Sequence, residues 1–141
     1  MKKMLLLISI VLCLNAGIFT QKLSECFIKN TSSNDRILLA KWMFVVLSQY
    51  PELKSLSNVT PKVVDSYNKK VAFLFKRLLT KDCKKEASLV LKYEPGGMSE
   101  SFNILGKIAA GEIMLNKNVL NAVKGYTKYI DMEKIVKELT K

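Results

Sequence analysis

Apolar residues recur at spacings of three and four along most of the chain after residue 35, a pattern typical of amphipathic helices. The clearest case follows Thr60 and Pro61, where threonine can cap a helix and proline can occupy its first position. One face of the segment that follows carries Val64, Tyr67, Val71, Leu74 and Leu78, which predicts a helix of about five turns packed along one side. No alternating pattern long enough for a strand occurs. The sequence therefore predicts an all-α domain.

Further helices are expected on both sides of this one. Asn34 or Asp35 can cap a helix that Pro51 ends, and between residues 37 and 47 only Lys41 is polar, so we expect this helix to be central and buried. A shorter helix is expected to run to Tyr93, before a break at residues 95–97. Three more are expected: one capped by Ser99 with Leu115 on its apolar side, one over 119–129, and one capped by Asp131 with Met132, Ile135, Val136 and Leu139 on one face.

The first residues are typical of an export signal. Lys2 and Lys3 give a charged start, residues 4–14 form an apolar run, and residues 15–17 are small enough for a signal peptidase. The run is shorter than the roughly 20 apolar residues that a membrane span needs, so cleavage is favoured over anchoring. We expect residues 1–16 to be removed, with the cut between 16 and 21. Residues 17–141 then form a single periplasmic or secreted domain, a compact bundle of about five to six helices.

Cleavage leaves two cysteines. Cys13 departs with the leader, and Cys26 and Cys83 remain. An even pair in an oxidising compartment predicts a disulfide, which would close a loop of roughly 58 residues and stabilise the domain by about 4 kcal/mol. A catalytic thiol or a metal site is disfavoured, because the chain has no histidine and no CxxC spacing. We predict no metal and no cofactor.

The charge of the chain limits its partners. Without Lys2 and Lys3, 21 basic residues face 12 acidic ones, a net charge of +9. Residues 62–85 alone hold eight basic and two acidic residues, a net of +6. Outside the cytoplasm, such a surface favours an acidic protein or an anionic envelope surface as the partner, and not nucleic acid.

A candidate docking face lies on the long helix that follows Pro61. At 100° per residue, an exposed arc opposite the apolar stripe carries one aromatic side chain among cations. The aromatic ring could enter a partner's pocket while the cations attract an acidic surface. The alternative is that another segment covers the aromatic ring and that the lysines are simply solvated. The candidate residues are Lys62, Lys69, Lys70, Phe73, Lys76 and Arg77.

Glu112 is the second unusual position, because it projects into the apolar arc of its helix and needs a partner there. We expect a buried ion pair with Arg36 or Lys41. A general acid or base would need a second catalytic group, and none can be identified. The absence of histidine removes the commonest general base as well. We therefore predict no catalytic residue and no enzyme, with a cell-wall hydrolase that uses a carboxylate as the less favoured alternative.

In size, export signal, helicity and one disulfide, the chain resembles small exported helical proteins that bind another protein, including periplasmic immunity proteins. This general resemblance implies a non-enzymatic protein-binding module of immunity or inhibitor type. The alternative is a protein that binds anionic lipid or a membrane surface, which the charge and the apolar helices also favour.

Overall fold

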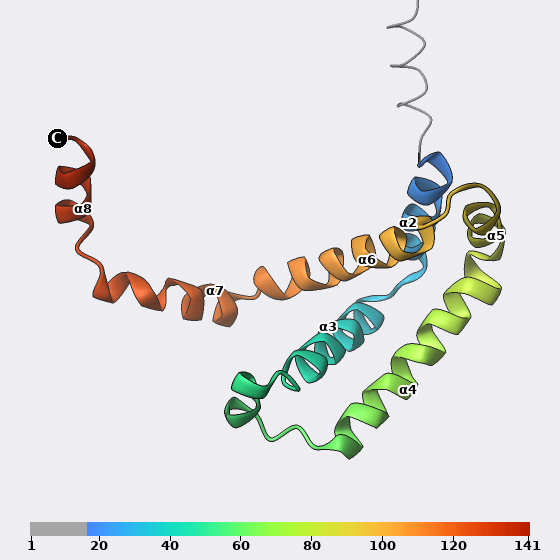
Figure 1. Cartoon of the computed structure of the whole chain (residues 1–141), viewed down its shortest axis with the longest axis horizontal. Coiled ribbons are helices and arrows are strands. Elements are labelled where there is room, and N and C mark those ends of the chain that lie inside the picture. Colours follow the sequence, from blue (N-terminus) through green and yellow to red (C-terminus); the bar gives the residue numbers. More distant parts are fainter. Residues whose placement is uncertain (1–16) are drawn as a thin grey trace, which may run out of the picture.

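The computed structural model describes residues 17–141, so the expected signal peptide, residues 1–16, lies outside the described part. Every regular element within 17–141 is a helix, and the all-α prediction is confirmed. Helices α2 to α6 form a bundle, and the following elements extend from it as an arm (Figure 1). The elements are α2 (Ile18–Asn30), α3 (Ser33–Leu47), the 3-10 helix η1 (Pro51–Leu56), α4 (Pro61–Arg77), the π-helix η2 (Leu78–Asp82), α5 (Lys84–Tyr93), α6 (Gly97–Met114), α7 (Lys117–Lys124), the 3-10 helix η3 (Gly125–Tyr129) and α8 (Met132–Leu139).

Helix α2 is the centre of the bundle. Leu23 and Phe27 are fully buried, and α2 packs against α5, α6 and η2. The hydrophobic pattern did not predict this helix, because two positions on its buried side are Thr20 and Ser24. Ser24 Oγ donates to the Thr20 carbonyl, and Ser101 Oγ of α6 donates to the same oxygen, so these buried hydroxyl groups are satisfied.

Helix α3 is at the edge of the bundle, and the prediction that it is central and buried is wrong. It packs against α4 and α6, which bury Leu39 and Val45, while Phe44 on its other side is 61% exposed. The residue that caps α3 also differs from the predicted Asn34 or Asp35. The Ser32 side chain accepts from the Asp35 amide, and the Asp35 carboxylate accepts from the Ser32 amide, so a capping box starts α3 at Ser33.

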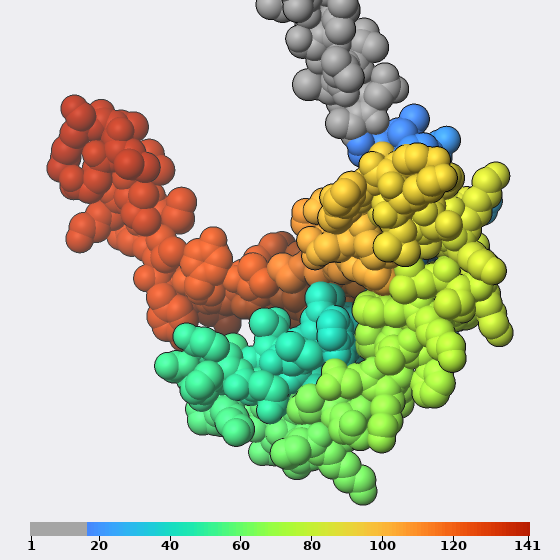
Figure 2. Space-filling model, turned by 45° about the vertical axis from the view of Figure 1, so that its right-hand side comes forward, coloured from blue at the N-terminus to red at the C-terminus, as the bar shows by residue number. Residues whose placement is uncertain are grey.

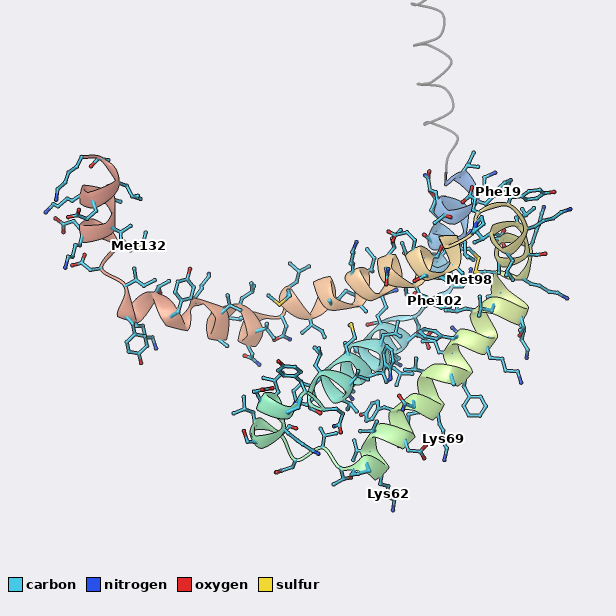
Figure 3. All side chains as sticks on the ribbon, viewed as in Figure 1. Phe19, Lys62, Lys69, Met98, Phe102 and Met132 are labelled. Carbon is cyan, nitrogen blue, oxygen red and sulfur yellow. A yellow bond between two sulfur atoms is a disulfide. The ribbon has the colours of Figure 1, made fainter. Side chains whose placement is uncertain are left out.

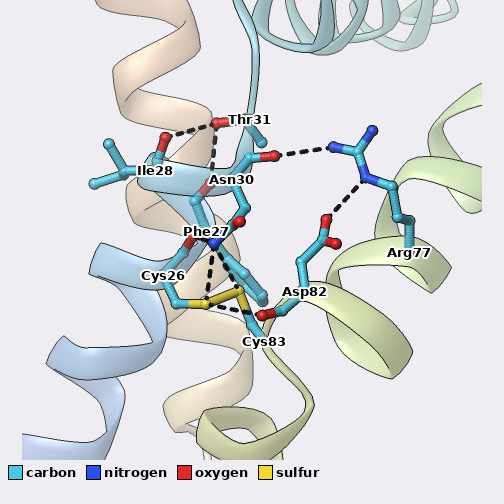
Figure 4. Close-up of a disulfide and its surroundings, with 8 residues drawn as sticks. All are labelled: Cys26, Phe27, Ile28, Asn30, Thr31, Arg77, Asp82 and Cys83. Carbon is cyan, nitrogen blue, oxygen red and sulfur yellow. Dashed lines mark hydrogen bonds and ion pairs between the residues drawn. A yellow bond between two sulfur atoms is a disulfide. The ribbon is translucent and has the colours of Figure 1, made fainter.

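Helix α4 has the predicted start and the predicted buried stripe. Thr60 Oγ1 accepts from the Val63 amide, and Val71 and Leu74 of α4 are buried against the bundle together with Leu78 at the start of η2. The predicted disulfide between Cys26 and Cys83 is also confirmed. It joins α2 to the residue after η2, beside the polar contacts that Figure 4 shows.

The start of α2 is held by the residue that follows α5. The Glu94 carboxylate accepts from the Phe19 amide at 3.0 Å, from the Thr20 amide at 2.7 Å and from Thr20 Oγ1. Gly17 supplies no side chain to cap this helix, so Glu94 fills that role from another element. Gly96, with a φ of 89°, then turns the chain into α6.

Gly97 brings α6 close to α2, and we expect its replacement by alanine to destabilise the fold. A Cβ at this position would overlap Thr20 Oγ1 and lie 2.9 Å from Val90 Cγ1. We expect Gly97→Ala to lower the free energy of unfolding by about 1–3 kcal/mol, measured by urea denaturation. Gly106→Ala is the matched control on the same helix, because its Cβ would meet nothing within 4 Å. Equal or greater stability of Gly97→Ala than of the wild type would contradict this packing.

After α6 the chain leads away from the bundle. Leu115, predicted to lie on the apolar side of this helix, is exposed, because no other helix within residues 17–141 covers it. Helix α7 packs against the end of α6, and α8 lies away from the bundle in both views (Figure 1, Figure 2). Asp131 caps α8 as predicted, since its Oδ1 accepts from the Lys134 amide. None of the helices within 17–141 is both long enough and apolar enough to cross a membrane.

Candidate docking surface on helix α4

The site is formed by a single helix whose two faces differ sharply. Val71 and Leu74 of α4 point into the bundle, while Phe73 between them is 73% exposed. The four nearest neighbours of Phe73 on a helix surface are the residues three and four positions away, and all four are cationic. They are Lys69, Lys70, Lys76 and Arg77, which with Phe73 we call the Phe73 face.

The Phe73 face points to solvent. Lys62 and Lys69 lie on the outer side of α4 and point away from the other helices (Figure 3). The alternative that another segment covers Phe73 does not hold within residues 17–141. Lys62 is eleven residues before Phe73, or about 16 Å along the helix axis, so it lies beyond the immediate surroundings of the ring.

The three lysines of the Phe73 face have different local partners. Lys69 Nζ pairs with Asp65 at 2.8 Å, and this hydrogen bond raises the pKa of Lys69. Lys70 Nζ lies 5.0 Å from the centre of the Tyr67 ring, within reach of a cation–π contact. In the described part of the chain, Lys76 takes part in no ion pair. All three side chains are exposed, so their cationic groups lie around Phe73 on the solvent side of α4.

Arg77 has a structural role in addition to its charge. Its Nε donates to Asp82 at 2.9 Å, and its Nη2 donates to the Asn30 carbonyl at 3.0 Å (Figure 4). Nη2 also donates to the Asp35 carboxylate at 3.0 Å. Pairing with Asp35, followed by Asp82, raises the pKa of Arg77. The guanidinium group therefore joins the end of α4 to the connection between α2 and α3, close to the disulfide.

Two carboxylates that the fold uses are expected to make the protein sensitive to acid. Burial alone would raise the pKa of Asp35, but hydrogen bonds from Ser32 and Arg77 outweigh it and lower the pKa below 3.8. Burial alone would also raise the pKa of Glu94, but hydrogen bonds from Thr20 and Phe19 outweigh this effect and lower the pKa below 4.5. Groups with lowered pKa values stabilise the fold above their unfolded-state pKa, and this stabilisation is lost as the pH falls through their folded-state values.

We therefore expect Asp35→Asn combined with Glu94→Gln to be less stable than the wild type near neutral pH, yet less affected by acid. Melting temperatures between about pH 7 and pH 2 test this, because the wild type should lose more of its stability over that range. Parallel pH profiles for the two proteins would contradict the assigned roles of these carboxylates.

Glu112 pairs with Arg36 and not with Lys41. Arg36 Nε donates to Glu112 Oε1, and Arg36 Nη1 also donates to the Thr31 carbonyl at 2.6 Å. The side chains of Arg36 and Glu112 are 20% and 41% exposed, so the pair lies at the edge of the bundle. The expectation that this ion pair is buried is therefore wrong. Lys41 instead lines a groove between α3 and α4. Within residues 17–141 no group of three acidic or cysteine side chains could hold a metal ion.

Two further surfaces did not enter the sequence prediction of the site. One is the groove between α3 and α4, about 540 Å³ in volume, and the other is the exposed apolar side of α8. Both left a signal in the sequence, because the α3 segment is apolar nearly all round and the α8 stripe has the spacing i, i+3, i+4, i+7. The pattern showed the apolar positions but not that the bundle leaves them uncovered. Comparisons of the chain with protein-family models, with curated proteins and with solved structures found no match.

Proposed function

We propose that the mature protein is a non-enzymatic protein-binding module of immunity or inhibitor type that works in the periplasm and binds an acidic protein partner through the Phe73 face. The observation that carries this proposal is the 73% exposure of Phe73 among four cationic neighbours. Burial of an exposed aromatic side chain by a partner contributes a large favourable free energy of binding, because the ring has a large apolar surface. Aromatic residues are enriched among those that dominate binding energy. The surrounding cations supply the complementarity that selects an acidic surface and speeds its approach.

An extracytoplasmic location fits both the leader and the disulfide. Disulfides such as Cys26–Cys83 persist in oxidising compartments, the periplasm among them. The structure also bears on the cleavage site. A cut after residue 16 leaves α2 complete, whereas a cut near residue 21 would remove the amides of Phe19 and Thr20 that Glu94 holds. We therefore propose residue 17 as the mature start.

Affinity capture from an envelope extract tests the proposal with oxidised protein of residues 17–141 as bait. Three baits are compared: the wild type, Phe73→Ala with Lys69→Glu and Lys76→Glu, and a control with Leu91→Ala, Lys84→Glu and Lys85→Glu. The control removes an equally exposed apolar side chain, since Leu91 is 76% exposed, and changes the charge by the same amount on helix α5.

The proposal expects an acidic protein that the wild type and the α5 control retain and that the Phe73-face variant loses. Equal capture by all three baits would contradict the site. Anionic lipid vesicles address the alternative partner. Sedimentation with vesicles at low salt that the Phe73-face variant loses would overturn the protein-partner proposal in favour of an anionic lipid surface.

A further inference from the structure

The C-terminal arm, residues 117–141, carries large apolar and aromatic side chains that no helix within 17–141 covers. Every residue of α8 is exposed, with Leu139 at 81%. The same holds before α8, where Tyr129 of η3 is 89% exposed. The exposed apolar and aromatic residues of the arm are Leu120, Val123, Tyr126, Tyr129, Met132, Ile135, Val136 and Leu139.

Helix α8 has one apolar side and one charged side. At 100° per residue its apolar residues fall within an arc of about 100°, and its lysines and glutamates fall on the opposite side. A helix as short as α8 is marginal in water unless its apolar side packs against something. We therefore expect this side of α8 to be covered in the working protein.

The arm carries its net positive charge beside its aromatic residues. Residues 117–130 contain three lysines and no acidic residue, a side-chain charge of +3. Lys124 and Lys128 lie two positions on either side of Tyr126, and Lys128 directly precedes Tyr129. Tyrosine and lysine side chains combine an apolar part with a polar end, which suits the boundary between the headgroups and the hydrocarbon of a bilayer.

The acidic residues of the arm do not cancel this charge. Residues 131–141 hold three acidic residues and three lysines, so this part of the arm is neutral. Glu133 pairs with Lys137 at 2.9 Å. Glu138 pairs with Lys141 at 2.7 Å. The lysines of residues 117–130 therefore decide which surface the arm attracts, and that surface is anionic.

The position of the arm suits a broad surface. It leads away from the bundle, and α8 lies at its far end (Figure 1, Figure 2). A large surface can therefore approach α8 without displacing another element of the described chain. The uncovered residues are spread over α7, η3 and α8, and a fluid lipid interface accommodates such a spread more readily than a rigid protein pocket does.

We propose that the C-terminal arm binds the surface of a membrane that contains anionic phospholipid. The apolar stripe of α8 and the two tyrosines lie at the headgroup boundary, and Lys117, Lys124 and Lys128 lie near the lipid phosphates. The strength of such binding depends both on the apolar area that is buried and on the attraction to anionic lipid. This anchor goes beyond the proposed partner binding, because the arm holds the protein at the membrane while the Phe73 face on α4 remains free for the acidic protein.

Co-sedimentation with vesicles in about 0.15 M salt tests the anchor, because binding by charge alone is weakened there. The protein is oxidised residues 17–141, and the vesicles contain phosphatidylcholine with or without phosphatidylglycerol. The stripe variant, Ile135→Gln with Leu139→Gln, should have a membrane partition coefficient at least about tenfold lower than that of the wild type. Leu56→Gln with Leu91→Gln is the control, since both leucines are exposed but lie outside the arm, and it should bind like the wild type. All four positions are exposed, so the bundle should remain folded in both variants, which the urea midpoint checks.

The lysines of the arm are tested in the same way. Lys124→Glu with Lys128→Glu should lower the partition coefficient at least about tenfold on vesicles with phosphatidylglycerol. Lys84→Glu with Lys85→Glu on α5 changes the net charge equally and should bind more tightly than this arm variant. The Phe73-face variant of the capture experiment should bind vesicles as well as its α5 control does, since the two have the same net charge. Vesicle binding and partner capture can thus fail separately.

Several results would overturn the anchor. They are a wild type that does not sediment with phosphatidylglycerol vesicles, a stripe variant that binds as tightly as the wild type, and equal losses in the two charge reversals. A wild-type dimer in sedimentation velocity without lipid that the stripe variant loses would assign the stripe to a second copy and also overturn the proposal. Selective loss of vesicle binding in the Phe73-face variant would place the lipid site on α4 instead.

Discussion

Removal of the disulfide is expected to lower the free energy of unfolding by about 4 kcal/mol, a large share of the stability of a domain of this size. Cys26 and Cys83 are separated by 57 positions, so the bond closes a long loop and restricts the unfolded chain strongly. It also connects the central helix α2 to the end of the α4–η2 unit. Urea denaturation of oxidised and reduced wild-type protein measures the effect.

The double variant Cys26→Ala with Cys83→Ala provides the control for this experiment. Cys83 is fully buried, so its replacement by alanine adds a small packing loss that reduction alone does not cause. The variant should therefore be at most slightly less stable than the reduced wild type, and reductant should not change it further. An unchanged urea midpoint after reduction of the wild type would contradict the stabilising role of the bond.

Reversal of the two lysines beside Phe73 is expected to slow association with the partner by tenfold or more at low ionic strength. Lys69→Glu with Lys76→Glu changes the local charge by four units but leaves the ring in place. Because exposed charges act through solvent, the effect should shrink as salt rises from about 0.05 M to 0.5 M. Stopped-flow or surface-plasmon measurements with the captured partner follow this rate.

The same reversal on α5, Lys84→Glu with Lys85→Glu, is the matched comparison. Both pairs are exposed and alter the net charge equally, so only their positions differ. If the two variants slow association to the same extent, the total charge of the protein and not the Phe73 face attracts the partner.

The sequence predicted best those elements whose signals are local. Thr60 and Pro61 begin α4, Asp131 caps α8, and residues 95–97 break the chain, and each depends on the chemistry of a few neighbouring residues. The disulfide was predicted because two cysteines remain after cleavage of the leader and the expected compartment is oxidising, and the bond is confirmed. The exposed position of Phe73 could be anticipated from α4 alone, because one helix positions both its buried stripe and its outer face.

The sequence could not show which apolar surface covers which. Helix α3 is almost uniformly apolar, and only the packing of α4 and α6 leaves the side with Phe44 open. Helix α2 was not predicted for the opposite reason. Its buried side includes the polar residues Thr20 and Ser24, whose hydroxyl groups form hydrogen bonds in the fold, so the apolar pattern is interrupted. Both outcomes depend on contacts between elements far apart in the chain, which periodicity does not encode.

The central claim is that the Phe73 ring anchors an acidic partner, and isothermal titration of that partner with wild-type protein, Phe73→Ala and Phe73→Trp tests it most directly. Phe73 is exposed, so its truncation should leave the fold intact and change binding alone. The account predicts a dissociation constant at least about 30-fold higher for Phe73→Ala and substantial retention of affinity by Phe73→Trp. Equal dissociation constants for Phe73→Ala and the wild type would contradict it.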